Sequence, residues 1–194
     1  MIPAEAVSDL TEKEYLEIER LAEYKSEYFE GQMFAMSGAS RAHNLIVANL
    51  IFTLILQLKK TPCQVYPSDM RVKVRENGLY TYPDVIVACG EEEFDDEHQD
   101  TLANPLLIIE VLSKSTEAYD RGAKFALYRE LGSLAEYLLV DPSRPQAEQY
   151  VRQEENRWLL SEAKGTGAVI TLSAVNASLS LADIYDKVSW ETRK

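Results

Sequence analysis

The sequence predicts an α/β domain in which a mixed β-sheet is flanked by helices. Residues 41–60 are apolar with helical spacing. Residues 85–89 and 106–112 are compact runs of Val, Ile and Leu, typical of central strands covered on both faces. A second helical pattern and a further apolar strand follow. With 194 residues, of which 46% are hydrophobic, the chain suits one core. We therefore expect a single domain over residues 1–194.

An N-terminal helical arm and a hairpin are expected before this core. Thr11 followed three residues later by Glu14 is a capping box, and the apolar spacing after it predicts an amphipathic helix over residues 11–23. Residues 27–36 predict two short strands around the turn Glu30-Gly31.

The helix over residues 41–60 is expected to be mostly buried, because apolar residues cover most of its circumference. Pro62 ends the pattern. The helix has a single polar stripe, formed by Asn49, Thr53, Gln57 and Lys60.

Residues 70–75 alternate strictly between apolar and basic side chains, which predicts a strand with three bases on one face. Asn77-Gly78 then marks a turn. The bases, Arg71, Lys73 and Arg75, either contact phosphates or form a solvated strand face, and the sequence leaves both open.

The remaining elements complete the layered core. Asp120 as N-cap and Gly132 as C-cap bracket a helix over residues 121–131, and residues 137–140 form a buried strand. A C-terminal β-hairpin (149–152 with 158–161) and a short helix near 181–188 follow. This gives a core of about 27–142, an arm at 11–23 and a C-terminal extension at 147–188.

The formal charge of −12 does not exclude a nucleic-acid partner, because the acids are concentrated in two segments. Residues 1–30 hold nine acids and three bases, and residues 91–100 hold seven acids and no base. The rest of the chain is nearly neutral. The two cysteines, Cys63 and Cys89, are too few for a disulfide framework, so we expect buried thiols and no structural zinc.

Several function classes lack a sequence signal. The longest apolar stretch, residues 45–58, is shorter than a membrane span, and residues 1–5 show no signal peptide, so we expect a cytoplasmic protein without membrane contact. Neither a phosphate-binding loop, a dinucleotide fingerprint nor a serine-nucleophile elbow is present, and no small-molecule cofactor is expected.

Glu110 is the most informative residue, because it interrupts the apolar run 106–112. A buried carboxylate requires a partner, which is either a core base or donor, or a metal ion. Asp84 begins the neighbouring apolar strand after Pro83, and such an acid taken alone is more often a turn or edge residue. Two carboxylates on adjacent strands repel each other unless a cation lies between them, which favours a divalent metal site.

Lys124 is the candidate cationic group. It shares one face of the predicted helix with Arg121 and Tyr128, at i, i+3 and i+7, and this helix follows the strand that carries Glu110. A solvated surface lysine is the alternative.

Four segments together resemble the bacterial Uma family of proposed restriction endonucleases, which belongs to the PD-(D/E)XK nuclease superfamily. The first segment is Tyr82-Pro83-Asp84-Val85, and the other three are residues 104–116, 120–124 and 136–141. Glu27 to Gly31 resembles the family's opening hairpin, and His43 with Asn44 its helix entry. The resemblance extends over about residues 15–188.

The resemblance implies a restriction-endonuclease-like core in which Asp84 and Glu110 bind Mg²⁺ or Mn²⁺. The superfamily lysine would fall at position 112, which is Leu here, and Lys124 matches the family's alternative position. Lys114 is the weaker substitute.

Three further residues are candidates around this centre: Glu27 as an additional carboxylate, and His43 and Tyr128 as supporting residues. Arg121 is a further candidate phosphate contact. An exposed hairpin acid and a core histidine are the respective alternatives for Glu27 and His43.

The expected function is a metal-dependent endonuclease acting on DNA, with a homodimer expected by analogy, since cutting a duplex calls for two sites. The alternative is a catalytically degenerate nuclease fold that binds nucleic acid or protein as a regulatory module.

Overall fold

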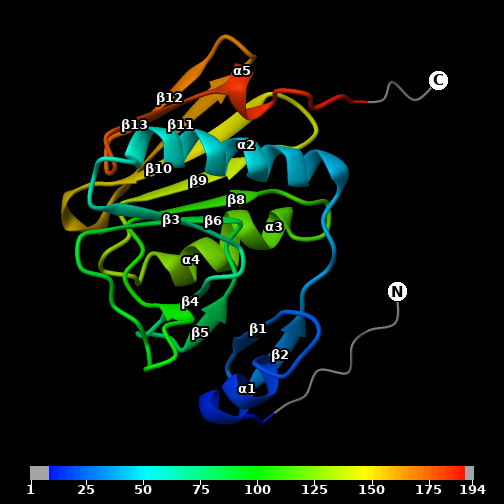
Figure 1. Ribbon diagram of the computed structural model, residues 1–194, viewed down its shortest axis with the longest axis vertical. Helices are drawn as coiled ribbons and strands as arrows, with labels where there is room; N and C mark the ends of the chain where they lie inside the picture. The colour runs from blue at the N-terminus through cyan, green and yellow to red at the C-terminus, as the bar shows by residue number, and fades with distance from the viewer. Residues whose placement is uncertain (1–8, 191–194) are drawn as a thin grey trace.

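The computed structural model describes residues 9–190, so the signal-peptide prediction made from residues 1–5 lies outside the described residues. Three layers are visible: α2 and the C-terminal elements, a six-stranded sheet, and the helical run α3–α4 with a second sheet and the N-terminal arm (Figure 1). The helices are α1 (Glu12–Glu19), α2 (Arg41–Leu58), α3 (Glu117–Tyr119), α4 (Phe125–Tyr128) and α5 (Leu181–Ile184). The strands are β1 (Ser26–Phe29), β2 (Gln32–Ala35), β3 (Cys63–Pro67), β4 (Arg71–Val74), β5 (Leu79–Thr81), β6 (Val85–Cys89), β7 (Thr101–Leu102), β8 (Leu107–Val111), β9 (Glu136–Val140), β10 (Gln146–Arg152), β11 (Trp158–Lys164), β12 (Val169–Leu172) and β13 (Ala177–Ser180).

The central sheet has the strand order β11-β10-β9-β8-β6-β3. It is mixed, because β8 runs parallel to β9 and antiparallel to β6. The predicted α/β class with a mixed sheet and flanking helices is therefore confirmed. The structure adds a second sheet, in the order β2-β1-β5-β4-β7, which the sequence did not separate from the first.

Alternation along β8 decides which layer each side chain meets. Leu107, Ile109 and Val111 pack in the core beneath α2, whereas Ile108 and Leu112 pack in the core that contains α4. Because side chains alternate along a strand, Glu110 belongs to the second face. The strand thus directs this carboxylate toward the helical run that carries Lys124.

Helix α2 is less buried than its sequence predicts. Its buried residues are Ile46, Leu50, Leu54 and Leu58. The opposite side leaves Phe52 69% and Leu56 64% exposed, because the sheet covers only one face. Part of the predicted polar stripe contacts the C-terminal extension instead of solvent. Asn49 donates to Ile184 O (3.0 Å), and Gln57 donates to Ser178 O (2.7 Å).

Helix α2 is the one described helix that is long and apolar enough to span a membrane, judged by length and composition. Its buried face packs on the six-stranded sheet as a core helix would. No membrane helix is clearly present among residues 9–190.

The helix predicted over residues 121–131 begins earlier. A continuous helical run extends from Glu117 to Tyr128, with a π-turn over Asp120–Lys124 between α3 and α4. The main chain turns at Ser113, whose hydroxyl accepts from the Thr116 N–H (3.2 Å) and whose carbonyl accepts from the Glu117 N–H (2.9 Å). Asp120 therefore is not an N-cap: it lies inside the run and is buried.

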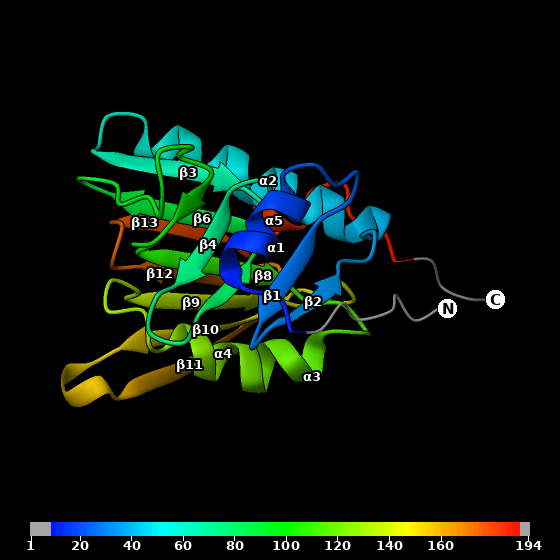
Figure 2. The ribbon, with the colours of Figure 1, turned by 90° about the horizontal axis from the view of Figure 1, so that it is seen from below.

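The N-terminal arm and hairpin form as predicted. The Thr11–Glu14 capping box opens α1, which ends earlier than predicted, at Glu19. The β1–β2 turn places Glu30 and Gly31 at positive φ. The C-terminal hairpin β10–β11 is longer than predicted, and a further hairpin, β12–β13, was not predicted. Figure 2 shows the arm nearest to the viewer, with α3 and α4 beside it.

The prediction of two thiols is wrong, because Cys63 and Cys89 form a disulfide. They lie directly opposite each other in the β3–β6 register, a relation that the sequence does not reveal.

We expect this cross-link to stabilise the fold by about 3 kcal/mol, since it closes a loop of 26 residues in the unfolded chain. Urea unfolding of the wild type with and without reductant measures the effect, and Cys63→Ser is expected to match the reduced protein. If reductant leaves the unfolding midpoint unchanged, the disulfide does not contribute to the free energy of unfolding.

Candidate active site

Glu110 and Lys124 form a buried ion pair between β8 and the helical run. The Lys124 ammonium lies 2.9 Å from Glu110 Oε1, and their side chains are 6% and 7% exposed. The Tyr128 hydroxyl, one turn further along, donates to the same carboxylate oxygen at 2.9 Å. The partner that a buried Glu110 requires is therefore a base together with a hydroxyl.

Asp84 lies against the backbone of the Glu110 strand. The Val111 N–H donates to Asp84 Oδ2 at 2.8 Å, and the Asp84 N–H lies 3.4 Å from Glu110 Oε2. His43, near the start of α2, places Nε2 3.1 Å from the same Oδ2 atom. Among the described residues, Asp84 Oδ1 makes no hydrogen bond. The carboxylate is thus held by one oxygen and has the other free.

Glu27 reaches the cluster from the N-terminal hairpin. Its Oε1 lies 2.8 Å from Lys124 Nζ and accepts from the Thr81 hydroxyl at 2.5 Å. The ammonium is therefore held between one acid of β1 and one of β8. Because an ammonium has three N–H donors, one remains for another acceptor.

The cluster contains more negative than positive charge. Three carboxylates, those of Glu27, Glu110 and Asp120, lie 2.8, 2.9 and 3.9 Å from the single ammonium, and Asp84 lies beside Glu110. Burial, with Asp84 and Asp120 nearby, raises the pKa of Glu110 to about 8 despite the opposing effect of Lys124. Burial alone would lower the pKa of Lys124, but Glu110, Glu27 and Asp120 outweigh it and hold that pKa well above its ordinary value. The ammonium therefore stays charged, but its single positive charge does not balance the acids of the cluster.

This donor set fits a divalent ion held by two carboxylates. Among residues 9–190, no group of three or more His, Cys, Asp or Glu side chains is arranged as a complete metal site. Mg²⁺ needs only one or two carboxylates when water and substrate phosphates complete its shell. Asp84 and Glu110 supply that number, and the unbalanced negative charge favours a cation beside them.

The other sequence candidates lie outside the cluster. Lys114 is exposed in the turn after β8. Arg121 pairs with Glu117 and Glu148, because the π-turn shifts it away from the face that Lys124 and Tyr128 share.

Arg71 and Lys73 of β4, and Arg75 directly after it, are matched with carboxylates of the acidic segment 91–100. Arg71 is buried and pairs with Asp100, Lys73 with Asp95, and the exposed Arg75 with Glu93. These bases are thus paired with acids, which neither of the two alternatives left open by the sequence included, because the pairing depends on where residues 91–100 fold.

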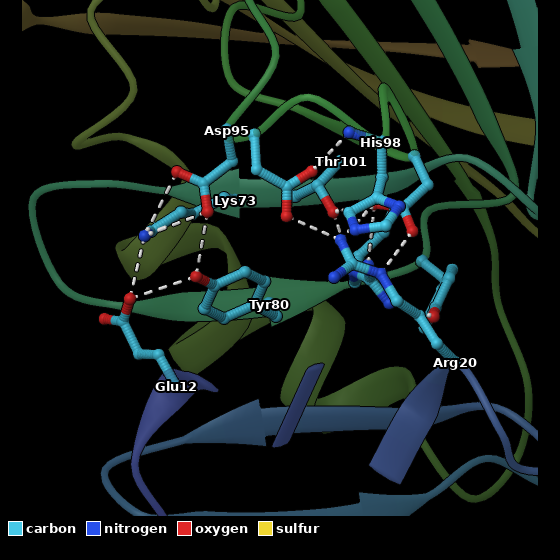
Figure 3. A network of polar contacts seen from close by, with 11 residues as sticks. Glu12, Arg20, Lys73, Tyr80, Asp95, His98 and Thr101 are labelled. Atoms are coloured by element: carbon cyan, nitrogen blue, oxygen red, sulfur yellow. Dashed lines mark hydrogen bonds and ion pairs between the residues drawn. The ribbon is translucent and has the colours of Figure 1, made fainter. Parts of the chain in front are cut away.

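Figure 3 shows how this network joins the arm to the second sheet. Arg20, after α1, donates to Asp100 (2.8 Å) and Asp96 (2.6 Å). Lys73 Nζ lies 2.8 Å from Glu12 and 3.2 Å from Asp95. A surface hollow opens beside these residues. The network fixes the arm whose hairpin supplies Glu27.

We expect the stability supplied by this network to fall in acid. Hydrogen bonds from Arg20, together with the charge of Arg71, hold the pKa of Asp100 well below its ordinary value. A lowered folded-state pKa contributes stability that is complete above the unfolded-state pKa and is lost as the pH falls toward the folded one.

Urea midpoints measured from pH 7 to pH 3 check this expectation. Asp100→Asn is expected to lower the midpoint at pH 7 and to lose less on acidification than the wild type. Parallel pH profiles for the two proteins would contradict it.

Sequence reasoning missed two members of the cluster. Asp120 was interpreted as a helix cap, yet its Oδ1 lies 3.9 Å from Lys124 Nζ. Thr81 carries no signal of its own, because its role depends on the pairing of β1 with β5. Burial of an acid does not by itself identify a functional residue. Glu136 is fully buried, but it accepts hydrogen bonds from the Ser173 hydroxyl and the Ala174 N–H and lies outside the cluster.

Comparisons with known proteins identify the family. Residues 12–183 match the model of the Uma2 family, described as "Putative restriction endonuclease". Protein sll1609 of Synechocystis sp. is 40% identical over 164 residues, covering 84% of this chain and 93% of that protein. Protein slr1290 of the same organism is 33% identical over 183 residues, covering 94% and 95%.

A solved structure has the same fold. It is the crystal structure of a "putative nuclease belonging to DUF820" from Anabaena variabilis, with a TM-score of 0.73 and 19% identity, covering 93% of this chain and 99% of that chain. The resemblance noted from the sequence blocks is thereby confirmed. The chain belongs to the Uma2 family of restriction-endonuclease-like proteins.

Proposed function

We propose that this protein is a metal-dependent endonuclease that hydrolyses phosphodiester bonds of DNA. Asp84 and Glu110 would bind Mg²⁺ or Mn²⁺, and Lys124 would be the cationic catalytic residue. One observation supports the proposal: the Glu110 carboxylate is bonded to the Lys124 ammonium of the next helix, and Asp84, directly before the adjacent strand, is joined to Glu110 and Val111 by hydrogen bonds that involve backbone N–H groups. The family assignment supports nuclease activity.

Each side chain has a distinct task in this mechanism. A divalent ion, when bound, supplies Lewis acidity at a phosphate oxygen and activates water. Asp84 offers its free Oδ1, while Val111 N–H and His43 hold Oδ2 in place. Tyr128 fixes Glu110 Oε1. Lys124 keeps two N–H groups on Glu27 and Glu110 and directs its third toward the charge that develops on the phosphate.

Lys114 is the exposed base best placed to contact the phosphates of a substrate. Lys114 is exposed directly after β8 and has its ammonium available to a substrate. The β4 bases and Arg121 would first have to leave their carboxylate partners, so we propose that they mainly hold the arm and the β10 strand. A homodimer with two such sites would cut both strands of a duplex.

Nicking of supercoiled plasmid tests the function. Wild type with Mg²⁺ or Mn²⁺ is expected to nick the plasmid, and chelation with EDTA is expected to stop it. Asp84→Asn is expected to be inactive, and the matched control Asp69→Asn, an exposed acid paired with Lys25, is expected to be fully active. Binding of DNA without cleavage under every metal tested would instead favour the degenerate nuclease fold. Cleavage confined to an RNA substrate would overturn DNA as the substrate.

A further inference from the structure

Asp120 is a buried carboxylate that the proposed mechanism does not use. Its side chain is 6% exposed, as is that of Lys124, and its Oδ1 lies 3.9 Å from the Lys124 ammonium. It stands inside the helical run, so it caps no helix N-terminus. Burial raises the pKa of Asp120, although Lys124 and the Thr116 hydroxyl favour its ionised form. The fold thus keeps this acid where its charge is costly.

The position of Asp120 relative to Lys124 is set by the π-turn. Both residues are buried, at the first and last positions of the turn Asp120–Lys124. Such turns are rare and frequently occur at functional sites. The turn faces both side chains into the cluster and leaves Arg121, between them, on the side of Glu117 and Glu148.

A metal ion bound by Glu110 would contact the same carboxylate as the Lys124 ammonium. A divalent cation beside Glu110 draws charge from that carboxylate and repels the ammonium bonded to its Oε1 atom. Two carboxylates face the ammonium from other sides: Glu27 at 2.8 Å and Asp120 at 3.9 Å. Their attraction opposes the repulsion, and Asp120 acts from the same helix as Lys124.

We infer that Asp120 is a positioning residue that keeps the Lys124 ammonium in the cluster when a divalent cation occupies the adjacent carboxylates. This inference rests on the proposed function, because it takes Glu110 as a metal ligand. Asp120 itself contacts neither substrate nor metal: it acts through Lys124.

Nuclear magnetic resonance of the lysine side chains tests this role without reference to cleavage. In protein labelled with ¹⁵N-lysine, the buried Lys124 ammonium is expected to give a slowly exchanging signal, assigned by its loss in Lys124→Arg. Millimolar Mg²⁺ is expected to leave this signal in place in the wild type and to broaden it beyond detection in Asp120→Asn. The same signal in both proteins with Mg²⁺ would overturn the inference, whether or not the protein cuts DNA.

Steady-state cleavage supplies the second measurement. Asp120→Asn is expected to lower kcat at least tenfold and to leave KM within twofold. A misplaced ammonium would stabilise the transition state less, while substrate binding would not change. Glu117→Gln, an exposed acid one turn earlier, is the control and is expected to keep both constants. Thermal unfolding of Asp120→Asn is expected to match the wild type or exceed it, since the substitution removes a costly buried charge. An unchanged kcat, or a change in KM alone, would overturn the positioning role.

Discussion

Replacing Lys124 with methionine is expected to abolish DNA cleavage and to destabilise the fold by about 3–5 kcal/mol, the usual cost of removing one partner of a buried ion pair. Methionine keeps an unbranched side chain of similar shape and removes the ammonium, with its charge and its three N–H donors. Glu27 and Glu110 would then lose an ammonium at 2.8 and 2.9 Å. Urea unfolding measures the loss of stability, and plasmid nicking measures the loss of activity.

Lys114→Met is the matched control for this substitution. Lys114 is exposed, so its replacement is expected to leave the unfolding midpoint unchanged and to weaken cleavage only slightly. If Lys124→Met cuts normally while Lys114→Met is inactive, the assignment of the catalytic lysine is wrong. If Lys124→Met unfolds at the wild-type midpoint, the buried ion pair does not form.

Mn²⁺ is expected to raise the thermal unfolding temperature of the wild type by about 8 °C at a concentration one hundred times its Kd. A ligand that binds only the folded state stabilises it by about 2.7 kcal/mol at that excess, and each kcal/mol moves the midpoint of a protein of this size by about 3 °C. The gain arises because the metal neutralises carboxylates that burial leaves without a full counter-charge.

Asp84→Asn is expected to remove most of this gain, because the amide supplies a weaker ligand and one negative charge fewer. Asp69→Asn is expected to show the wild-type response, which excludes a general effect of surface charge. Scanning calorimetry with and without Mn²⁺ makes the comparison. Equal shifts in Asp84→Asn and the wild type would place the metal elsewhere.

The sequence predicted the parts of the site that depend on local pattern. Glu110 is conspicuous because it interrupts an apolar run, and its alternation with Ile109 and Val111 indicates the opposite face of the sheet. The capping box of α1 and the β1–β2 turn likewise follow from residues close in the sequence. Lys124 was a candidate from its spacing with Tyr128 on the helix after the Glu110 strand, and the resemblance between sequence blocks supported it.

The features of the fold and site that depend on contacts between distant segments could not be predicted from the sequence. Asp120 was interpreted as a cap because the Ser113 interactions that start the helix one turn earlier are not visible in composition. The Cys63–Cys89 disulfide depends on the register of β3 with β6. The bases on β4 are matched with acids only once residues 91–100 fold across them. Each of these is a tertiary relation that no periodicity encodes.

A crystal structure of the protein soaked in Mn²⁺, with anomalous diffraction recorded for the metal, tests the central claim most directly. We predict one anomalous peak between Asp84 and Glu110, with Asp84 Oδ1 as a ligand and the Lys124 ammonium still beside Glu110. A peak at another group of acids, or a peak in Asp84→Asn as strong as in the wild type, would contradict a metal centre built from β6, β8 and the following helix.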